Sequence, residues 1–197
     1  MMKPAEIDKT EFDKILLTID VSVKYDLALS LVEATIPIWE NYAKDSDTLS
    51  YFDGIGNHFK IEYQDESGNL HNLEKDIVFK TVQIIKAEKI KSGSQAIALQ
   101  QICNKLKAHS EAIDIWDDWQ PFEADVTLSA AHNLVQLHQE KFIGVEETKL
   151  NLIIWQAVMA VVTAKTKTLN EIKHWLRLAS NNNKQPDGPD RTPNNEH

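Results

Sequence analysis

Hydrophobic residues recur along most of this chain with the spacing of α-helices. Phe12, Ile15, Leu16 and Ile19 fall on one face of a helix, which is the pattern of a helix with one buried side. The same spacing predicts helices over about residues 10–19, 22–43, 75–91, 94–109, 110–119, 125–142, 146–165 and 168–179. We therefore predict a mainly α fold, a single irregular bundle of about seven helices.

Prolines and capping residues mark several of the predicted boundaries. Pro37 lies inside the second segment, and because proline lacks an amide hydrogen and clashes with the preceding turn, the helix should kink or restart near Ile36. Pro121 stops the helix before it, and Asp125 is the predicted N-cap of the helix that follows. Residues 49–52 are expected to form a short turn after a loop.

One stretch departs from the helical pattern. Phe59, Ile61 and Tyr63 alternate with polar residues, as they would in a strand with one buried face. Residues 65–69 have the composition of a turn. The sequence therefore predicts a small β-hairpin near 58–73, in which a strand over about 58–64 pairs with 69–73, with an ordered loop as the alternative.

The most hydrophobic stretch covers residues 152–164. A membrane span needs about 20 apolar residues, and shorter runs are more often buried helices. Because residues 150–164 are apolar nearly all round, we expect neighbouring helices to enclose this helix and predict that it is the central one of the bundle. No secretory signal is visible at the start of the sequence, so a cytoplasmic protein without a membrane partner is expected.

The predicted domain covers residues 1–179 and is followed by a tail. Residues 180–197 contain no aliphatic or aromatic side chain. Such a segment cannot bury enough apolar surface to offset the entropy lost on ordering. We therefore predict that residues 180–197 are disordered.

Composition and charge narrow the classes of partner. The chain is 42% hydrophobic and 26% charged, which is ordinary for a globular protein. Thirty acidic against 21 basic residues give a net charge of −9. Nucleic-acid binding depends on clustered Lys and Arg, so no nucleic-acid partner is expected.

Motifs of common catalytic and metal sites do not occur in the sequence. There is no Gly-x-Ser-x-Gly motif and no P-loop. Glu171 and His174 match the Glu-x-x-His motif of di-iron bundles once, where two matches are needed. Cys103 has the spacing of a core residue. We expect no catalytic residue, no metal and no cofactor, although catalytic groups can converge without any motif.

The acidic segment of residues 111–125 is the strongest functional feature. It contains six acids, no base and three aromatic residues. On a helical wheel Ala112 and Ile113 lie on the same side as Trp116 and Trp119, opposite the acids. The simplest interpretation is a helix whose tryptophans pack inward and whose acids face water. The functional hypothesis is that the acids attract a basic protein partner. Its candidate binding residues are Glu111, Asp114, Asp117, Asp118, Trp119, Phe122 and Glu123.

Three segments give the chain a resemblance to a known class of proteins. They are Ile-Trp-Glu-Asn-Tyr at 38–42, Ser-Tyr-Phe-Asp at 50–53 and Trp-Gln-Ala-Val-Met-Ala-Val-Val at 155–162. With its acidic, helical character, the chain resembles the all-helical immunity proteins of bacterial polymorphic-toxin and contact-dependent inhibition systems.

The resemblance implies a non-enzymatic protein that binds a cognate toxin, often a nuclease, and blocks its active site. It assigns no binding residue. Two alternatives stay open: a helical scaffold or regulatory adaptor that presents a groove, and a helical enzyme with a small-ligand pocket between its helices.

Overall fold

The computed structural model describes residues 7–44, 50–52, 58–90, 96–114, 122–139 and 147–181, and these form eight helices and four short strands. The helices are α1 (Lys9–Leu16), α2 (Val21–Ala34), α3 (Ile36–Lys44), α4 (Ile77–Ile90), α5 (Ala96–Asp114), α6 (Phe122–Gln139), α7 (Glu147–Thr163) and α8 (Leu169–Asn181). The strands are β1 (Ser50–Phe52), β2 (His58–Lys60), β3 (Glu62–Gln64) and β4 (Leu70–Asn72). The prediction of a mainly helical bundle with a small hairpin is confirmed.

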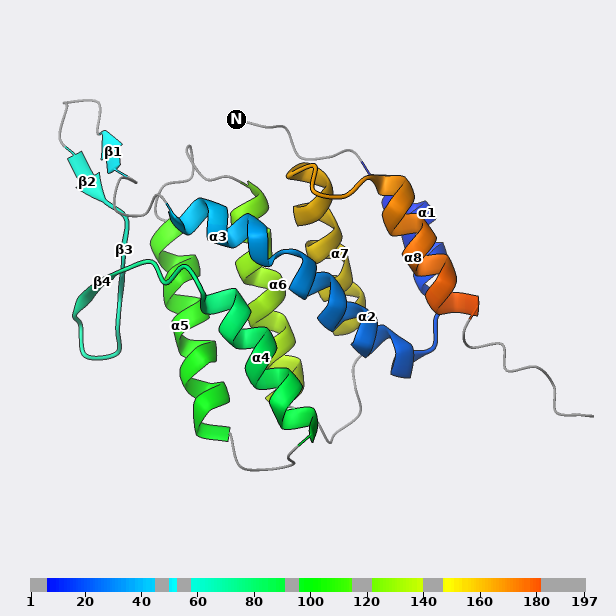
Figure 1. The fold of residues 1–197 in the computed structure, drawn as a ribbon, viewed down its shortest axis with the longest axis horizontal. Coiled ribbons are helices and arrows are strands. Elements are labelled where there is room, and N and C mark those ends of the chain that lie inside the picture. The colour runs from blue at the N-terminus through cyan, green and yellow to red at the C-terminus, as the bar shows by residue number, and fades with distance from the viewer. Residues whose placement is uncertain are drawn as a thin grey trace, which may run out of the picture.

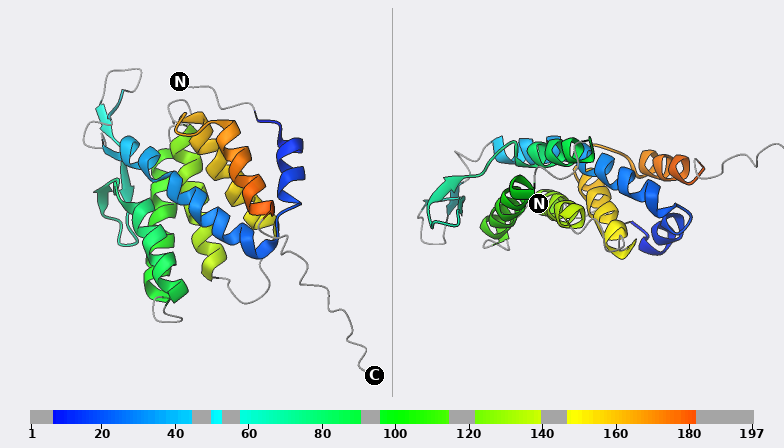
Figure 2. Two further views of the ribbon diagram at one scale, coloured as in Figure 1. Left: turned by 45° about the vertical axis from the view of Figure 1, so that its right-hand side comes forward. Right: turned by 90° about the horizontal axis from the view of Figure 1, so that it is seen from below.

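The helices pack in two layers. α5, α6 and α7 lie side by side, and α2, α3 and α4 cover one face of them (Figures 1 and 2). α1 and α8 pack against each other at the end of the molecule beside α7, and the strands lie at the opposite end beside α5 (Figure 1). None of the described helices is long and apolar enough to span a membrane.

The centre of the bundle is α6 rather than α7. α7 is enclosed as expected, with Ile153, Ile154 and Val158 fully buried. One side of α7 nevertheless reaches the surface, where Leu152 is 46% exposed. α6 packs against α2, α3, α4, α5 and α7. The prediction that residues 150–164 form the central helix is therefore wrong, because hydrophobicity reports burial and not position in the bundle.

The break at Pro37 is confirmed. α2 ends at Ala34, and α3 begins at Ile36, which places Pro37 in the first turn, where a helix does not need its amide hydrogen. Between the two helices, the Thr35 hydroxyl donates a hydrogen bond to the carbonyl of Val32 (2.7 Å). The short α3 then places Trp39 fully in the core.

The strands pair differently from the prediction. The expected strand over 58–64 is divided at Ile61. Its second half, β3, forms the hairpin with β4, with Tyr63 opposite His71, whereas its first half, β2, pairs with β1. Residues 50–52 are thus β1 and not a turn, because three residues are too few to show the alternation of a strand.

Two predicted helix boundaries are wrong. Residues 94–109 and 110–119 were expected as separate helices, but α5 is continuous to Asp114, because its buried face extends through His109 to Ile113. α6 begins at Phe122, so Asp125 lies in its first turn and is not the N-cap.

The last helix is longer than predicted and is fixed at both ends. Thr168 and Glu171 form a capping box: the Thr168 amide donates to Glu171 Oε2 (2.7 Å), and the Glu171 amide donates to Thr168 Oγ1 (3.2 Å). At the other end, the Ser180 hydroxyl bonds to that of Thr18 (3.0 Å). α8 therefore continues to Asn181, and the rest of the predicted tail, residues 182–197, lies outside the described residues.

Candidate functional site

The acidic segment lies where α5 ends and α6 begins. Glu111 and Asp114 belong to the last turn of α5, and Phe122 and Glu123 open α6. The candidate residues Asp117, Asp118 and Trp119 lie outside the described residues. Because α5 and α6 pack as neighbours running in opposite directions (Figure 1), the described candidates share one end of this helix pair.

The described side chains follow the predicted helical wheel. Ala112 and Ile113 are buried, whereas the Glu111 side chain is 66% exposed and lies 3.5 Å from the ammonium of Lys107, one turn earlier. An exposed pair of this kind contributes between zero and about 1 kcal/mol, so the carboxylate stays available to a partner. Phe122 and Glu123 are half-buried.

A second cluster of titratable groups surrounds Glu74, which connects β4 to α4. Glu74 Oε1 accepts hydrogen bonds from the Tyr63 hydroxyl (2.9 Å) and the Lys105 ammonium, and Oε2 accepts one from Lys80 (3.3 Å). Burial alone would raise the pKa of this carboxyl group, but the hydrogen bonds from Lys105 and Tyr63 outweigh it and lower the pKa to about 2. The Glu74 carbonyl also accepts from the Trp39 indole (2.9 Å).

His109 uses both of its ring nitrogens inside this cluster. Nδ1 donates to the Lys105 carbonyl (2.7 Å), which fixes the neutral tautomer, and Nε2 accepts from the Glu74 amide (2.8 Å). Burial lowers the His109 pKa to about 4. With both nitrogens bonded within the fold, His109 is not placed to act as a general base.

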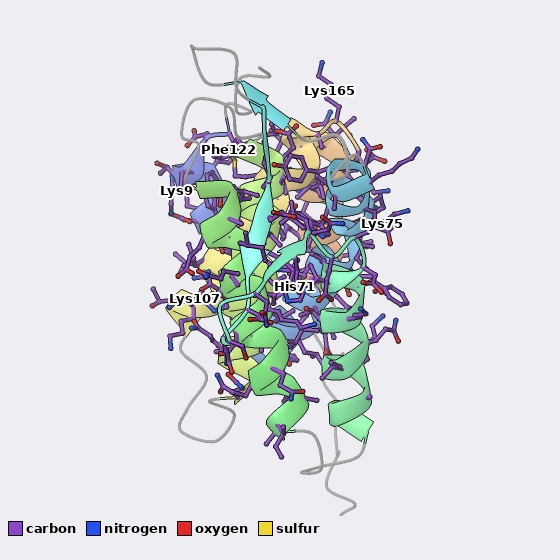
Figure 3. All side chains as sticks on the ribbon, turned by 90° about the vertical axis from the view of Figure 1, so that its left-hand side faces the viewer. Lys9, His71, Lys75, Lys107, Phe122 and Lys165 are labelled. Atoms are coloured by element: carbon purple, nitrogen blue, oxygen red, sulfur yellow. The ribbon has the colours of Figure 1, made fainter. Side chains whose placement is uncertain are left out.

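The rings around His109 complete this structural junction. Tyr63 stacks between His109 (4.2 Å between ring centroids) and His71 (5.3 Å), and Trp39 meets the His109 ring edge-on. Figure 3 looks onto this end of the molecule, with the labelled His71 on the hairpin near the centre of the view. The cluster, which sequence reasoning missed, fastens the hairpin to α3, α4 and α5. We name Tyr63, Glu74, Lys105 and His109 the hairpin junction.

A third group of polar side chains holds α2 against α6 and α7. The fully buried Lys24 forms an ion pair with Glu147 in the first turn of α7. The adjacent Tyr25 hydroxyl is hydrogen-bonded to Nδ1 of His138 on α6, and burial raises the Tyr25 pKa. No local pattern could have revealed these pairs, since their members are more than 100 positions apart.

The structure does not bring the two residues of the metal motif, Glu171 and His174, into a metal site among the described residues. Glu171 caps α8 through Thr168, and His174 is exposed. Among the described residues no group of three or more His, Cys, Asp or Glu side chains is arranged to hold a metal ion. Cys103 is buried with a free thiol, as its spacing predicts.

Comparison of the chain with models of protein families, with curated proteins and with solved structures finds no match. The resemblance to immunity proteins therefore depends on the three sequence segments alone. In two of them the tryptophans pack within the fold: Trp39 is fully buried, and the half-buried Trp155 meets Phe12 edge-on.

Proposed function

We propose that this protein is a non-enzymatic immunity protein that neutralises a cognate toxin by covering it with an acidic surface where α5 ends and α6 begins. We call the residues proposed for this surface the acidic patch, which is defined from the sequence as Glu111, Asp114, Asp117, Asp118 and Glu123 together with Trp119 and Phe122. Of these, Asp117, Asp118 and Trp119 lie outside the described residues. The position of Glu111 and Asp114 in the last turn of α5 is the observation that most supports the proposal.

Acids in the last turn of a helix oppose its macrodipole. The unpaired carbonyls there carry partial negative charge, and an acid beside them costs about 0.3–1 kcal/mol. The last turn of α5 contains no basic residue. The pair that Glu111 forms with Lys107 offsets part of this cost for Glu111, whereas a basic partner would relieve it for both acids and would be steered toward them.

The acids at the start of α6 provide an internal comparison. Glu123 and Asp125 lie in the first turn of α6, where negative charge stabilises a helix. Their acidity is explained by the fold itself. Glu111 and Asp114 therefore support a binding role more strongly than Glu123 does.

The hairpin junction favours binding over catalysis. It is a dense cluster of titratable groups, which is the usual sign of an active site. Both nitrogens of His109 and both carboxylate oxygens of Glu74 are nevertheless bonded within the protein. These groups stabilise the hairpin and leave the acidic patch as the better candidate for function.

The test is growth protection in a bacterial host. Each reading frame that flanks the gene is expressed with and without this protein, and we expect one product to arrest growth only when the protein is absent. The double variant Glu111→Lys with Asp114→Lys should lose protection. Failure of every flanking product to arrest growth would contradict the proposal.

A matched control separates local from overall charge. Glu11→Lys with Asp76→Lys makes the same change in net charge, and each of these acids pairs with one lysine, as Glu111 does with Lys107. This control should retain protection. Equal protection by both double variants would exclude the acidic patch as the binding surface.

A further inference from the structure

A groove of about 460 Å³ lies between the β3–β4 hairpin and α5. Residues 63–67 form one wall, and the other wall consists of Gln101, Asn104, Lys105 and Ala108. Tyr63, only 5% exposed, is held at the base by its stacking on His109. Because the hairpin junction fixes the two walls to each other, the groove is formed before any ligand binds.

Two of the charged side chains in the groove, Asp65 and Lys105, already bind other residues of the protein. Asp65 Oδ1 accepts the amides of Ser67 (2.9 Å) and Asn69 (2.8 Å), and Oδ2 pairs with His71 (2.8 Å). The Lys105 ammonium is bound by Glu74. These interactions hold the turn and the hairpin in place.

Glu66 is the carboxylate with capacity left for a ligand. Its Oε1 accepts a hydrogen bond from the Asn104 amide across the groove, and within the described residues no cationic side chain pairs with it. The neighbouring Gln101 side chain makes no hydrogen bond to another described residue. The groove thus offers one negative charge and a neutral amide close to it.

We propose that this groove receives an extended basic segment of the protein partner, with a lysine ammonium or an arginine guanidinium bound between Glu66 and Gln101. The inference rests on the proposed function and names a second contact region for the same partner. Charge decides the occupant: the described residues that line the groove include two carboxylates, Asp65 and Glu66, and one cation, Lys105, which Glu74 already binds. An anionic segment would be repelled, whereas a cation completes the hydrogen bonding of Glu66.

The groove leads along α5 toward the acidic patch. Gln101 and Glu111 are ten positions apart on α5, a rise of about 15 Å. About five residues of extended chain span this distance. One basic segment of about six residues could therefore contact Glu66 and Glu111 together, and this length sets the size of the probe.

The test measures binding of a fluorescein-labelled hexalysine peptide to the full chain by fluorescence anisotropy at low salt. Gln101→Lys places a positive charge in the groove and should raise the dissociation constant about fivefold. This is the change expected when a complex loses one exposed ion pair. Asn170→Lys is the control: Asn170 is also an exposed amide but lies on α8 at the far end of the molecule. It should change the dissociation constant less than about twofold.

A second variant guards against an indirect effect. Glu66→Gln removes the charge but keeps an oxygen for Asn104, so the fold should be retained by circular dichroism while hexalysine binds about fivefold more weakly. Equal effects of Gln101→Lys and Asn170→Lys would overturn the groove proposal, since the net charge alone would then bind the peptide. Displacement of hexalysine by equimolar spermidine would also overturn it, because the site would then bind a small polyamine and not a peptide segment.

The two proposals fail in different ways. If Glu111→Lys with Asp114→Lys abolishes growth protection while Gln101→Lys leaves hexalysine binding unchanged, the groove proposal is wrong and the immunity function stands. If Gln101→Lys selectively weakens hexalysine binding but the protein protects against no flanking product, the groove binds basic peptides and the immunity function is wrong.

Discussion

The backbone amide of Glu74 donates a hydrogen bond to Nε2 of His109 (2.8 Å), although the two residues are 35 positions apart. The other ring nitrogen of His109 donates to the Lys105 carbonyl (2.7 Å). Only neutral imidazole can make both bonds, because protonated Nε2 no longer accepts. The attachment of the hairpin to α5 therefore depends on the charge state of one histidine.

The first prediction concerns pH. The His109 pKa is about 4 in the folded protein, against 6.5 for an unperturbed histidine. The unfolded chain therefore binds a proton more readily, so this stabilisation is complete above pH 6.5 and is lost as the pH falls toward 4. It amounts to at most about 3 kcal/mol. Urea unfolding at pH 7, 5.5 and 4.5 measures the loss.

The control for this prediction is His109→Gln. The half-buried His132 also has a pKa lowered by burial. It therefore makes the free energy of unfolding fall on acidification in wild type and in the variant alike. The informative quantity is therefore the difference between the two pH profiles. The variant should be less stable at pH 7 and lose less stability on acidification. Parallel profiles would show that His109 does not titrate as the geometry requires.

The second prediction concerns the Glu74 carboxylate. Glu74→Gln keeps an acceptor for the Tyr63 hydroxyl but removes the charge that binds Lys105 and Lys80. We expect a loss of about 2 kcal/mol in the free energy of unfolding at pH 7. Since the Glu74 pKa is lowered from 4.5 to about 2, wild type should lose this advantage as the pH falls below 4.5 toward 2.

The matched control for Glu74 is Asp76→Asn. Asp76 also binds Lys80 (2.9 Å), but its side chain is 52% exposed. Its loss should cost less than about 0.5 kcal/mol. If the two variants are equally destabilised, the hairpin junction does not have the role assigned to it.

The third prediction uses the asymmetric burial of the Lys24–Glu147 pair. Lys24 is fully buried, whereas the Glu147 side chain is 46% exposed. Glu147→Gln removes the anionic partner of a buried ammonium and should cost about 3 kcal/mol. Lys24→Met leaves a carboxylate that water can solvate and fills the same space, so the change should be within about 1 kcal/mol of neutral. A larger loss for Lys24→Met in thermal or urea unfolding would contradict this account.

The fourth prediction concerns the rate of association with the cognate toxin once the growth assay has identified it. Association through the acidic patch should slow as salt rises, because salt screens the attraction between exposed charges. Reversal of Asp114, Asp117 and Asp118 to Lys should lower the association rate about tenfold and abolish its salt dependence. Stopped-flow fluorescence measures both effects, and unchanged rates would exclude these aspartates from the encounter surface.

Several features of the fold were predictable from short stretches of sequence. The break between α2 and α3 follows from the stereochemistry of Pro37, and α8 begins at Leu169, directly after its capping residue Thr168, within one residue of the predicted start. The buried Ala112 and Ile113 follow from helical periodicity. Each of these features depends on residues within one or two helical turns of each other. Proline stereochemistry, helix capping and helical periodicity all act over that short range.

The sequence by itself determined that this protein is mainly helical, where most helices lie, and that one segment is unusually acidic. Only the tertiary structure decided that β2 pairs with β1 and that α6 is central. It also decided that His109 accepts a hydrogen bond from the Glu74 amide and that Lys24 forms an ion pair with Glu147. The physical reason is distance along the chain. A helix is stabilised by neighbours in sequence, whereas the partner of a buried polar group is chosen by packing, which brings together residues that share no local pattern.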